Sequence, residues 1–232
     1  MDRRQELQAN LQDVEREISQ ACLAANRNRT DVTLIAVTKT WPATDVDLLA
    51  QLGVTDVGEN RDQEAKPKHD EVIAKELTWH AIGQLQTNKA KSVAAWADVV
   101  HSVDRIDLVA ALTKAVANRE APLGVLIQAN LDPAPTDTRG GALASELMTL
   151  AEMISNSEGL RLQGVMGVAP LGGDDDLAFA RLQEFSSQIQ SSYPEADWIS
   201  AGMSGDFATA LKYGATHLRI GSSILGKRGF QG

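Results

Sequence analysis

Residues 33–40 read Thr-Leu-Ile-Ala-Val-Thr-Lys-Thr, and this short stretch decides the fold. Its first five residues form an unbroken run of apolar and β-branched side chains, which is typical of a strand buried on both faces. The run ends at a lysine between two threonines, whereas a doubly wound dinucleotide-binding sheet has a glycine-rich turn after its first strand. The stretch therefore predicts the first strand of a parallel sheet that is not of the open, doubly wound type.

The same alternation of helical and strand patterns repeats along the chain. Further strands are predicted at 54–58, 77–82, 98–102, 123–129, 161–168, 197–201 and 216–220, and helices at 2–27, 44–51, 62–75, 87–95, 105–118, 143–156, 175–191 and 205–213. Such alternation requires right-handed crossovers, and eight parallel strands close a barrel. The sequence predicts an α/β fold, a single (β/α)8 TIM barrel domain over residues 1–232. The extra N-terminal helix, with Cys22 on its apolar face, is expected to cover the barrel where too few residues follow the last strand.

Composition excludes several classes of function. The chain has 22 Lys and Arg against 31 Asp and Glu, a formal net charge of −9, so it lacks the cationic surface that duplex nucleic acid requires. No apolar run approaches the roughly 18 residues of a membrane span, and no signal peptide is apparent. One cysteine cannot form an internal disulfide. We expect a cytoplasmic protein that binds neither nucleic acid nor membranes.

Lys39 directly follows the first strand, at the mouth of the predicted barrel. Beside a low-dielectric interior, an amine is desolvated toward the neutral form that attacks an aldehyde. Position alone leaves open a solvated rim lysine with no chemical role. The segments after the last two strands bear on that choice.

Both of the last two strands lead into segments rich in glycine and serine. Gly202-Met203-Ser204-Gly205 follows one, and Gly221-Ser222-Ser223 follows the other. Glycine exposes backbone N–H donors and serine adds hydroxyl donors, and the corresponding loops of TIM barrels commonly hold a phosphate. Ser204 is also expected to cap the following helix, and such residues often serve only the backbone. Opposite a rim lysine, the two segments favour a phosphorylated aldehyde or ketone as the ligand.

Polar residues on or just after other predicted strands could have either a structural or a ligand-binding role. Arg219 alternates with apolar neighbours, so it should point into the barrel and have a partner there, either a buried carboxylate or a ligand atom. Asn60 lines the mouth or caps the helix at 62. His80 and His101 are expected to be hydrogen-bonded core residues rather than rim residues. The four histidines and the cysteine show no zinc-binding spacing, so no metal site is predicted.

Together these residues resemble one family, the pyridoxal phosphate homeostasis proteins (the YggS/PLPBP group). The resemblance extends over nearly the whole chain and is carried by residues 35–40, 58–60 with 63–64, 79–89, 202–206 and 219–226. It implies a barrel like the N-terminal domain of alanine racemase, which is the barrel domain of fold-type III pyridoxal phosphate (PLP) proteins. It also implies PLP as the cofactor, held as a Schiff base on Lys39. Arg219 then faces the pyridine nitrogen, and the residues around the phosphate are Met203, Ser204, Gly221 and Ser222, with Asn60 as a further contact.

The chain departs from the family pattern at a few positions. The family usually has histidine where Gln84 stands and serine where Thr87 stands. The loop Asp132–Gly141, one of two loops expected on the barrel rim, lacks the usual glutamate and lysine, and Arg139 stands near the place of the lysine. The other expected rim loop is 169–176. These departures bear on contacts with partners more than on the cofactor.

The residues also bear on catalysis. Arginine is a donor only and stays charged, so opposite a pyridine nitrogen it weakens the ring as an electron sink. We therefore expect intracellular PLP buffering or delivery by a monomer, with no catalytic residues and with apo-PLP enzymes as transient partners. The alternatives are a PLP-dependent amino-acid racemase or decarboxylase and, ranked lower, a Schiff-base aldolase of phosphosugars. A pure interaction protein leaves Lys39 and Arg219 without a role.

Overall fold

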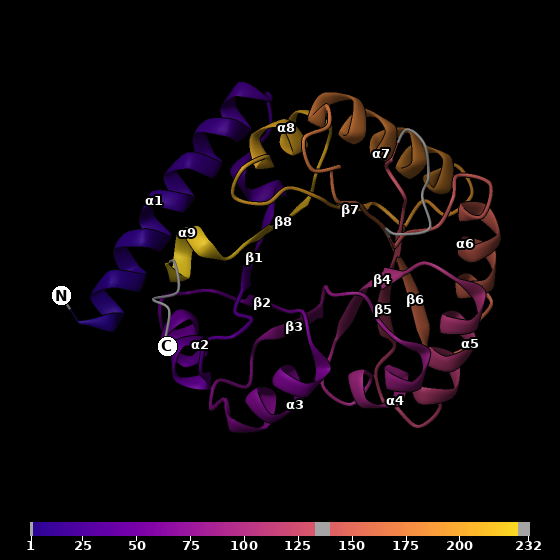
Figure 1. Ribbon diagram of the computed structural model, residues 1–232, viewed down its shortest axis with the longest axis horizontal. Helices are drawn as coiled ribbons and strands as arrows, with labels where there is room; N and C mark the ends of the chain where they lie inside the picture. The colour runs from indigo at the N-terminus through magenta and orange to yellow at the C-terminus, as the bar shows by residue number, and fades with distance from the viewer. Residues whose placement is uncertain (1, 133–139, 227–232) are drawn as a thin grey trace.

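The computed structural model describes residues 2–132 and 140–226, and its centre is a closed barrel of eight parallel strands (Figure 1). Each strand pairs with the next along the chain, and the last pairs with the first. The strands are β1 (Thr33–Val37), β2 (Asp56–Glu59), β3 (Thr78–Ala81), β4 (Val99–Val103), β5 (Leu123–Gln128), β6 (Leu160–Met166), β7 (Trp198–Ser200) and β8 (His217–Ile220). The predicted TIM barrel is confirmed.

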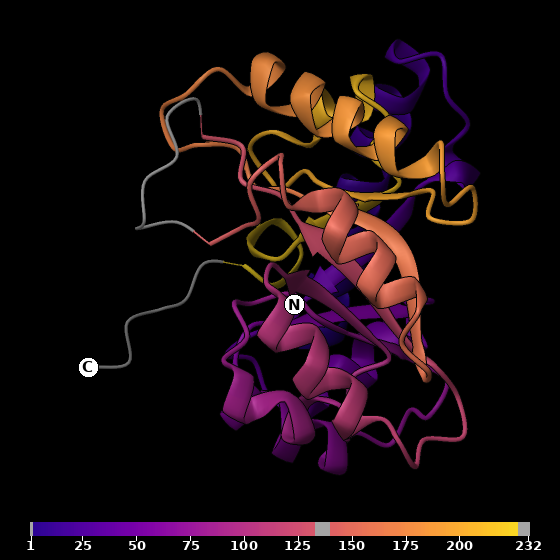
Figure 2. The same cartoon turned by 90° about the vertical axis from the view of Figure 1, so that its right-hand side faces the viewer.

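The helices lie outside the ring of strands (Figures 1 and 2). They are α1 (Arg3–Ala24), α2 (Ala43–Gln51), α3 (Asp62–Glu71), α4 (Ala90–Val93), α5 (Ile106–Ala115), α6 (Leu147–Ser155), α7 (Asp175–Gln190), α8 (Phe207–Lys212) and α9 (Ser222–Leu225), with 3-10 turns at Arg29–Asp31 and Thr87–Lys89. Most predicted helices are confirmed but shorter than expected. The helix predicted at 87–95 is a 3-10 turn followed by the short α4, and the helix predicted from 143 begins at Leu147.

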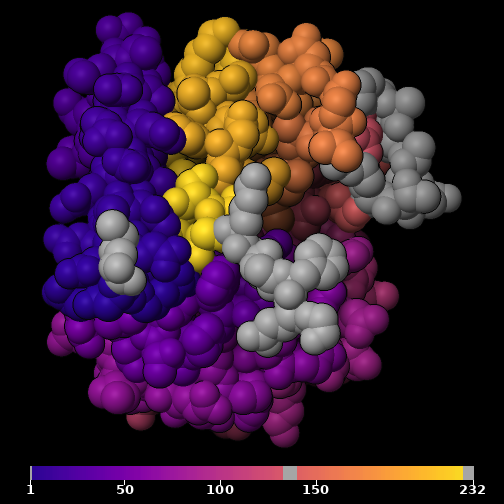
Figure 3. Space-filling model, turned by 60° about the vertical axis from the view of Figure 1, so that its left-hand side comes forward, coloured from indigo at the N-terminus to yellow at the C-terminus, as the bar shows by residue number. Residues whose placement is uncertain are grey.

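Helix α1 covers the side of the barrel that the short C-terminal elements leave open. Asp2 and Gln5 form a capping box at its start, which fixes where the helix begins. Its buried stripe is Leu7, Val14, Ile18 and Cys22, so Cys22 lies on the apolar face, as the sequence predicts. The helix packs against α8 and α9, and Figure 3 shows it lying alongside the yellow C-terminal elements. The expected covering role of the N-terminal helix is confirmed.

A buried ion pair fixes the carboxyl end of β1. The Lys68 ammonium on α3 donates to Glu59 Oε1 at 2.5 Å and to the Thr38 carbonyl oxygen at 2.7 Å. The Thr38 hydroxyl donates to the same carboxylate oxygen at 2.7 Å. All three residues are buried. Since Thr38 immediately precedes Lys39, this cluster holds the backbone from which the Lys39 side chain extends.

The structure describes one of the two expected rim loops completely and the other only in part. The loop at 169–176 connects β6 to the first turn of α7, and Leu171 at its tip is fully exposed. Most of the loop at 131–141, including Arg139, lies outside the described residues. Within residues 2–132 and 140–226, no helix has the length and apolar character needed to cross a membrane.

Replacing Lys68 with methionine should destabilise the fold, because the Glu59 carboxylate then stays buried without its counter-charge. We expect the free energy of unfolding to fall by about 3–5 kcal/mol, as for other broken buried ion pairs. Urea denaturation of both proteins measures this change. The matched control is Lys66→Met, an exposed lysine on the same helix, which should change little. Equal stabilities of the two variants would contradict a structural role for the pair.

Candidate functional site

Every predicted site residue lies on or just after four strands that are neighbours in the barrel. These strands are consecutive in the order β7, β8, β1 and β2. Lys39 follows β1 and Asn60 follows β2, whereas Met203 and Ser204 follow β7 and Arg219, Gly221 and Ser222 lie on or after β8. Carboxyl ends of parallel strands meet on one rim, which is where TIM barrels carry their active sites. Sequence positions far apart are thus collected on one side of one rim.

Lys39 extends from a tightly constrained turn. Its side chain is exposed, whereas the preceding Thr38 is fully buried. Thr40, directly after it, has φ of 70°, a left-handed conformation that is costly for a β-branched residue. Strain of this kind concentrates at functional sites, and here it turns the chain away immediately after the lysine. The amine is therefore accessible on a rigid support.

Two glycine turns bring a pair of serine hydroxyls together. Ser204 Oγ and Ser222 Oγ lie 3.5 Å apart, both exposed, although they come from the loops after different strands. At Gly202, φ is +91° and an added Cβ would lie 2.9 Å from the Phe207 Cα. At Gly221, an added Cβ would lie 3.0 Å from the Val37 carbonyl oxygen. Only glycine permits both close approaches, so the turns are shaped to hold two donors side by side.

The expectation that Ser204 caps helix α8 is wrong. Asp206 is the N-cap residue, and its Oδ1 accepts the Met203 backbone N–H at 2.5 Å. Helix α8 begins at Phe207, two residues later than predicted, so Ser204 lies outside the cap position and its hydroxyl faces Ser222. Burial raises the pKa of the Asp206 carboxyl. Met203 itself is 40% exposed beside the two serines.

Arg219 points into the barrel, as predicted, but it is not paired with a carboxylate. Its side chain is buried, and the guanidinium donates from Nη1 to Ser200 Oγ at 2.6 Å and from Nη2 to the Gly167 carbonyl oxygen at 2.9 Å. Within the described part of the chain it forms no ion pair, so a buried carboxylate partner is not observed. Desolvation lowers the pKa of Arg219 to about 10, while the charge of Asp206 opposes that shift. The group is still a cation at neutral pH, held by neutral acceptors below the rim.

Asn60 lies toward the β2–β3 side of the rim. The residue that caps α3 is Arg61, without a side-chain hydrogen bond, so a capping role for Asn60 is not observed. Asn60 is exposed and lines a cavity of about 120 Å³ together with Glu59 and Gln84. The structure therefore does not group it with the serine pair.

The histidines do not form a metal site. His80 and His101 are fully buried and hydrogen-bonded, which confirms them as core residues. Across the described ranges 2–132 and 140–226, no three His, Cys, Asp or Glu side chains lie close enough together to hold a metal ion.

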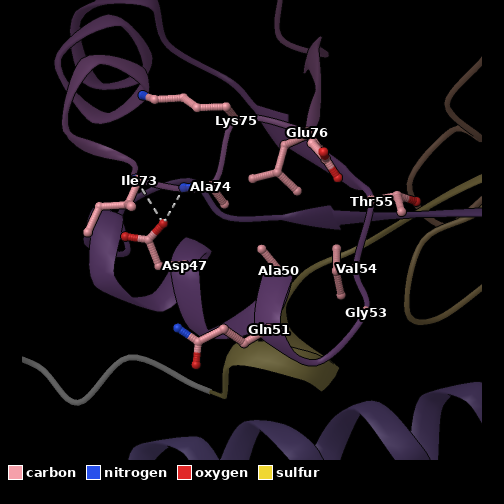
Figure 4. A pocket seen from close by; sticks show the side chains of 11 residues that line it. Asp47, Ala50, Gln51, Gly53, Val54, Thr55, Ile73, Ala74, Lys75 and Glu76 are labelled. Atoms are coloured by element: carbon pink, nitrogen blue, oxygen red, sulfur yellow. Dashed lines mark hydrogen bonds between the residues drawn. The ribbon is translucent and has the colours of Figure 1, made fainter.

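A larger cavity, of about 640 Å³, lies at the amino ends of β2 and β3 (Figure 4). Asp47 and Glu76 are the acidic residues that line it, and Asp47 Oδ1 already accepts the backbone N–H groups of Ile73 and Ala74, at 2.9 and 3.0 Å. None of the predicted site residues lines this cavity. The larger volume of this cavity therefore does not make it the candidate site.

Sequence reasoning missed the residues that support the site from below. Lys68 occupies a position in the buried stripe between Ala65 and Val72, and a lysine on an apolar stripe is the signal that indicates a buried ion pair. Ser200 lies two residues after the inward-facing Trp198 on β7, and side chains two apart on a strand point to the same face. The sequence could therefore have predicted that Ser200 also points into the barrel. Gly167 acts through its carbonyl oxygen, for which the sequence carries no signal.

Comparison with known proteins places these features in a family. Residues 5–229 match the family model of the alanine racemase N-terminal domain. A pyridoxal phosphate homeostasis protein of Mycobacterium leprae is 39% identical across 97% of this chain and 94% of its own length. Its counterpart in Haemophilus influenzae is 36% identical across 97% of each chain.

A solved structure agrees with these relatives. PipY of Synechococcus elongatus, solved with PLP bound, superimposes with a TM-score of 0.79 at 30% identity, covering 90% of this chain and 100% of its own. The sequence relatives and the solved barrel agree over nearly the full length of the chain. This chain belongs to the family of pyridoxal phosphate homeostasis proteins, built on the barrel of the alanine racemase N-terminal domain.

Proposed function

We propose that this protein binds PLP on the rim formed by β7, β8, β1 and β2 and acts in PLP homeostasis by buffering or delivering the cofactor. The observation that carries the proposal is Arg219, a buried cation whose partners in the structure are all neutral. A guanidinium in such a place calls for an electron-rich ligand atom. An accessible lysine and a pair of serine hydroxyls lie on the rim formed by the same strands.

The donor set fits the three polar groups of PLP. The Lys39 amine can condense with the aldehyde, losing one water and forming a Schiff base. The Ser204 and Ser222 hydroxyls, with the glycine turn at Gly221, offer donors to the phosphate, and Met203 borders them. Arg219 N–H groups can donate to the pyridine nitrogen. We assign Asn60 a peripheral contact, because it lies on the β2–β3 side.

The same donor set argues for holding PLP rather than turning over substrates on it. When bound, PLP supplies an electron sink, which is strongest with its pyridine nitrogen protonated. Arg219 cannot accept a proton and repels a second positive charge there. Racemisation also needs acid and base groups on both faces of a substrate. Of the two tyrosines, Tyr213 donates to Asp176 and Tyr193 packs against the hydrophobic core, so neither is assigned as a second catalytic group.

We further propose that the protein acts as a cytoplasmic monomer and meets apo-PLP enzymes only transiently. A closed barrel has no free sheet edge that a second copy must cover. The acidic net charge of −9 and the lone buried cysteine suit a reducing, soluble compartment. Delivery of PLP to these enzymes then depends on release of the cofactor from the accessible rim, and it needs no permanent interface between the two proteins.

Replacing Lys39 with alanine should abolish covalent attachment of PLP. We expect the wild type to show a yellow absorption band that borohydride bleaches, with the reduced adduct on the peptide containing Lys39. The variant should lack that band but retain weak, reversible binding through the phosphate. Lys66→Ala, an exposed lysine on α3, is the control and should behave as the wild type. Unchanged reducible cofactor on the Lys39 variant would overturn the assignment.

Removing both serine hydroxyls should weaken PLP binding without preventing it. The double variant Ser204→Ala, Ser222→Ala should lose about 1–3 kcal/mol of binding free energy, at about 0.5–1.5 kcal/mol for each hydrogen bond between exposed partners. A fluorescence titration gives the dissociation constants. Ser187→Ala, an exposed serine on α7, serves as the control. An unchanged dissociation constant for the double variant would remove these serines from the phosphate site.

Catalytic turnover should be negligible. With PLP bound, a panel of amino acids should racemise or decarboxylate no faster than with the same concentration of free PLP. Chiral chromatography of the amino acids after incubation measures both reactions. A rate well above the free cofactor that also disappears in Lys39→Ala would instead favour a racemase or decarboxylase.

A further inference from the structure

A continuous chain of hydrogen bonds crosses the barrel interior from β2 to β8. Asp56 Oδ1 lies 2.9 Å from His80 Nε2, and His80 Nδ1 lies 2.8 Å from His101 Nε2. His101 Nδ1 lies 2.9 Å from Ser200 Oγ, which accepts from Arg219 Nη1 at 2.6 Å. The histidines and Ser200 have no exposed surface. Such a polar interior is unusual, because TIM barrels are normally filled by branched apolar side chains.

One set of tautomers lets this chain run in a single direction. Arg219 can only donate, so Ser200 Oγ accepts from it, and the Ser200 hydroxyl is then available to donate to His101 Nδ1. His101 then carries its proton on Nε2 and donates to His80 Nδ1. His80 in turn carries its proton on Nε2 and donates to the Asp56 carboxylate. In this arrangement every link is satisfied with both histidines in the same tautomer, and every bond points from Arg219 toward Asp56.

The electrostatics of the interior agree with this arrangement. Burial lowers the pKa of His101 well below its ordinary value, and the nearby His80 and Arg219 add to the effect. Burial likewise lowers the pKa of His217, which stacks on Trp198, to about 3. Burial opposes ionisation of Asp56, but hydrogen bonds from His80 and Thr55 outweigh it and lower the pKa of that carboxyl. The chain thus has a fixed cation at one end and a carboxylate at the other.

We infer that Asp56, His80, His101 and Ser200 form a positioning relay for Arg219, which holds its guanidinium as an oriented donor to the pyridine nitrogen of PLP. The inference rests on the proposed function. Ser200 and the Gly167 carbonyl oxygen hold one N–H of each terminal nitrogen, which fixes the plane of the guanidinium and leaves its remaining N–H groups for a ligand. The distant Asp56 charge polarises each bond in the series. These residues act on PLP through Arg219 and do not touch it.

Nuclear magnetic resonance of the ¹⁵N-labelled apo protein tests the relay without any cofactor. Both His80 and His101 should carry their proton on Nε2, with Nδ1 unprotonated. Protonation of Nδ1 in either residue would reverse or break the chain and overturn the inference. Because this measurement uses the wild-type protein, it does not depend on whether a variant folds.

Variants of Ser200 test its effect on the cofactor. Ser200→Ala should weaken PLP binding about tenfold, the loss of one charge-assisted hydrogen bond, and should shift the absorption spectrum of bound PLP. Its adduct on Lys39 should still form. Ser200→Thr keeps the hydroxyl and should recover both properties. The control is Ser186→Ala, a buried serine on α7 that accepts from Gln190 and lies outside the barrel.

The outcomes separate the relay from the proposed function. Unchanged affinity and spectrum in Ser200→Ala, or equal changes in Ser186→Ala, would overturn the relay while leaving PLP binding intact. Failure of the wild type to bind PLP would instead overturn the proposed function, and the tautomers of the histidines would still be measured. Recovery by threonine together with Nε2 protonation supports the relay.

Discussion

The pairing of β8 with β1 is the constraint on which the site depends. Arg219 lies opposite Ile35 in this pairing, so the strand that carries the buried cation runs beside the strand that ends at Lys39. In an open sheet with this same sequential strand order, the first and last strands would lie on opposite edges. Closing the barrel instead brings the lysine, the arginine and the glycine-serine turn after β8 to neighbouring places on one rim.

Polar groups buried in a barrel are costly unless they have hydrogen-bond partners. The Arg219 guanidinium is held by a hydroxyl and a carbonyl oxygen, and the interior histidines are linked in series to a carboxylate. The same logic governs the Lys68–Glu59 pair, which contacts the backbone just before Lys39. Unpaired groups of these kinds would cost several kcal/mol each, so breaking either network should destabilise the fold. The rim residues rest on this rigid polar support.

Much of the architecture could be predicted from the sequence because the hydrophobic pattern alternates between strand and helix periods along the whole chain. The rim location of Lys39 and the serine turns followed from the rule that parallel strands end on one rim. The partners of Arg219 could not be predicted, because Ser200 and Gly167 come from other strands whose register only the closed sheet defines. The helix cap at Ser204 was predicted wrongly because the helix begins at Phe207, which makes Asp206 and not Ser204 the N-cap residue.

The most direct test of the account is a crystal structure of the protein grown with PLP. We predict continuous density from the Lys39 amine to the cofactor, the phosphate between Ser204 and Ser222, and the pyridine nitrogen facing Arg219. A cofactor attached to another lysine would contradict the account. So would a phosphate bound away from the two serines, or a ring nitrogen turned away from the guanidinium.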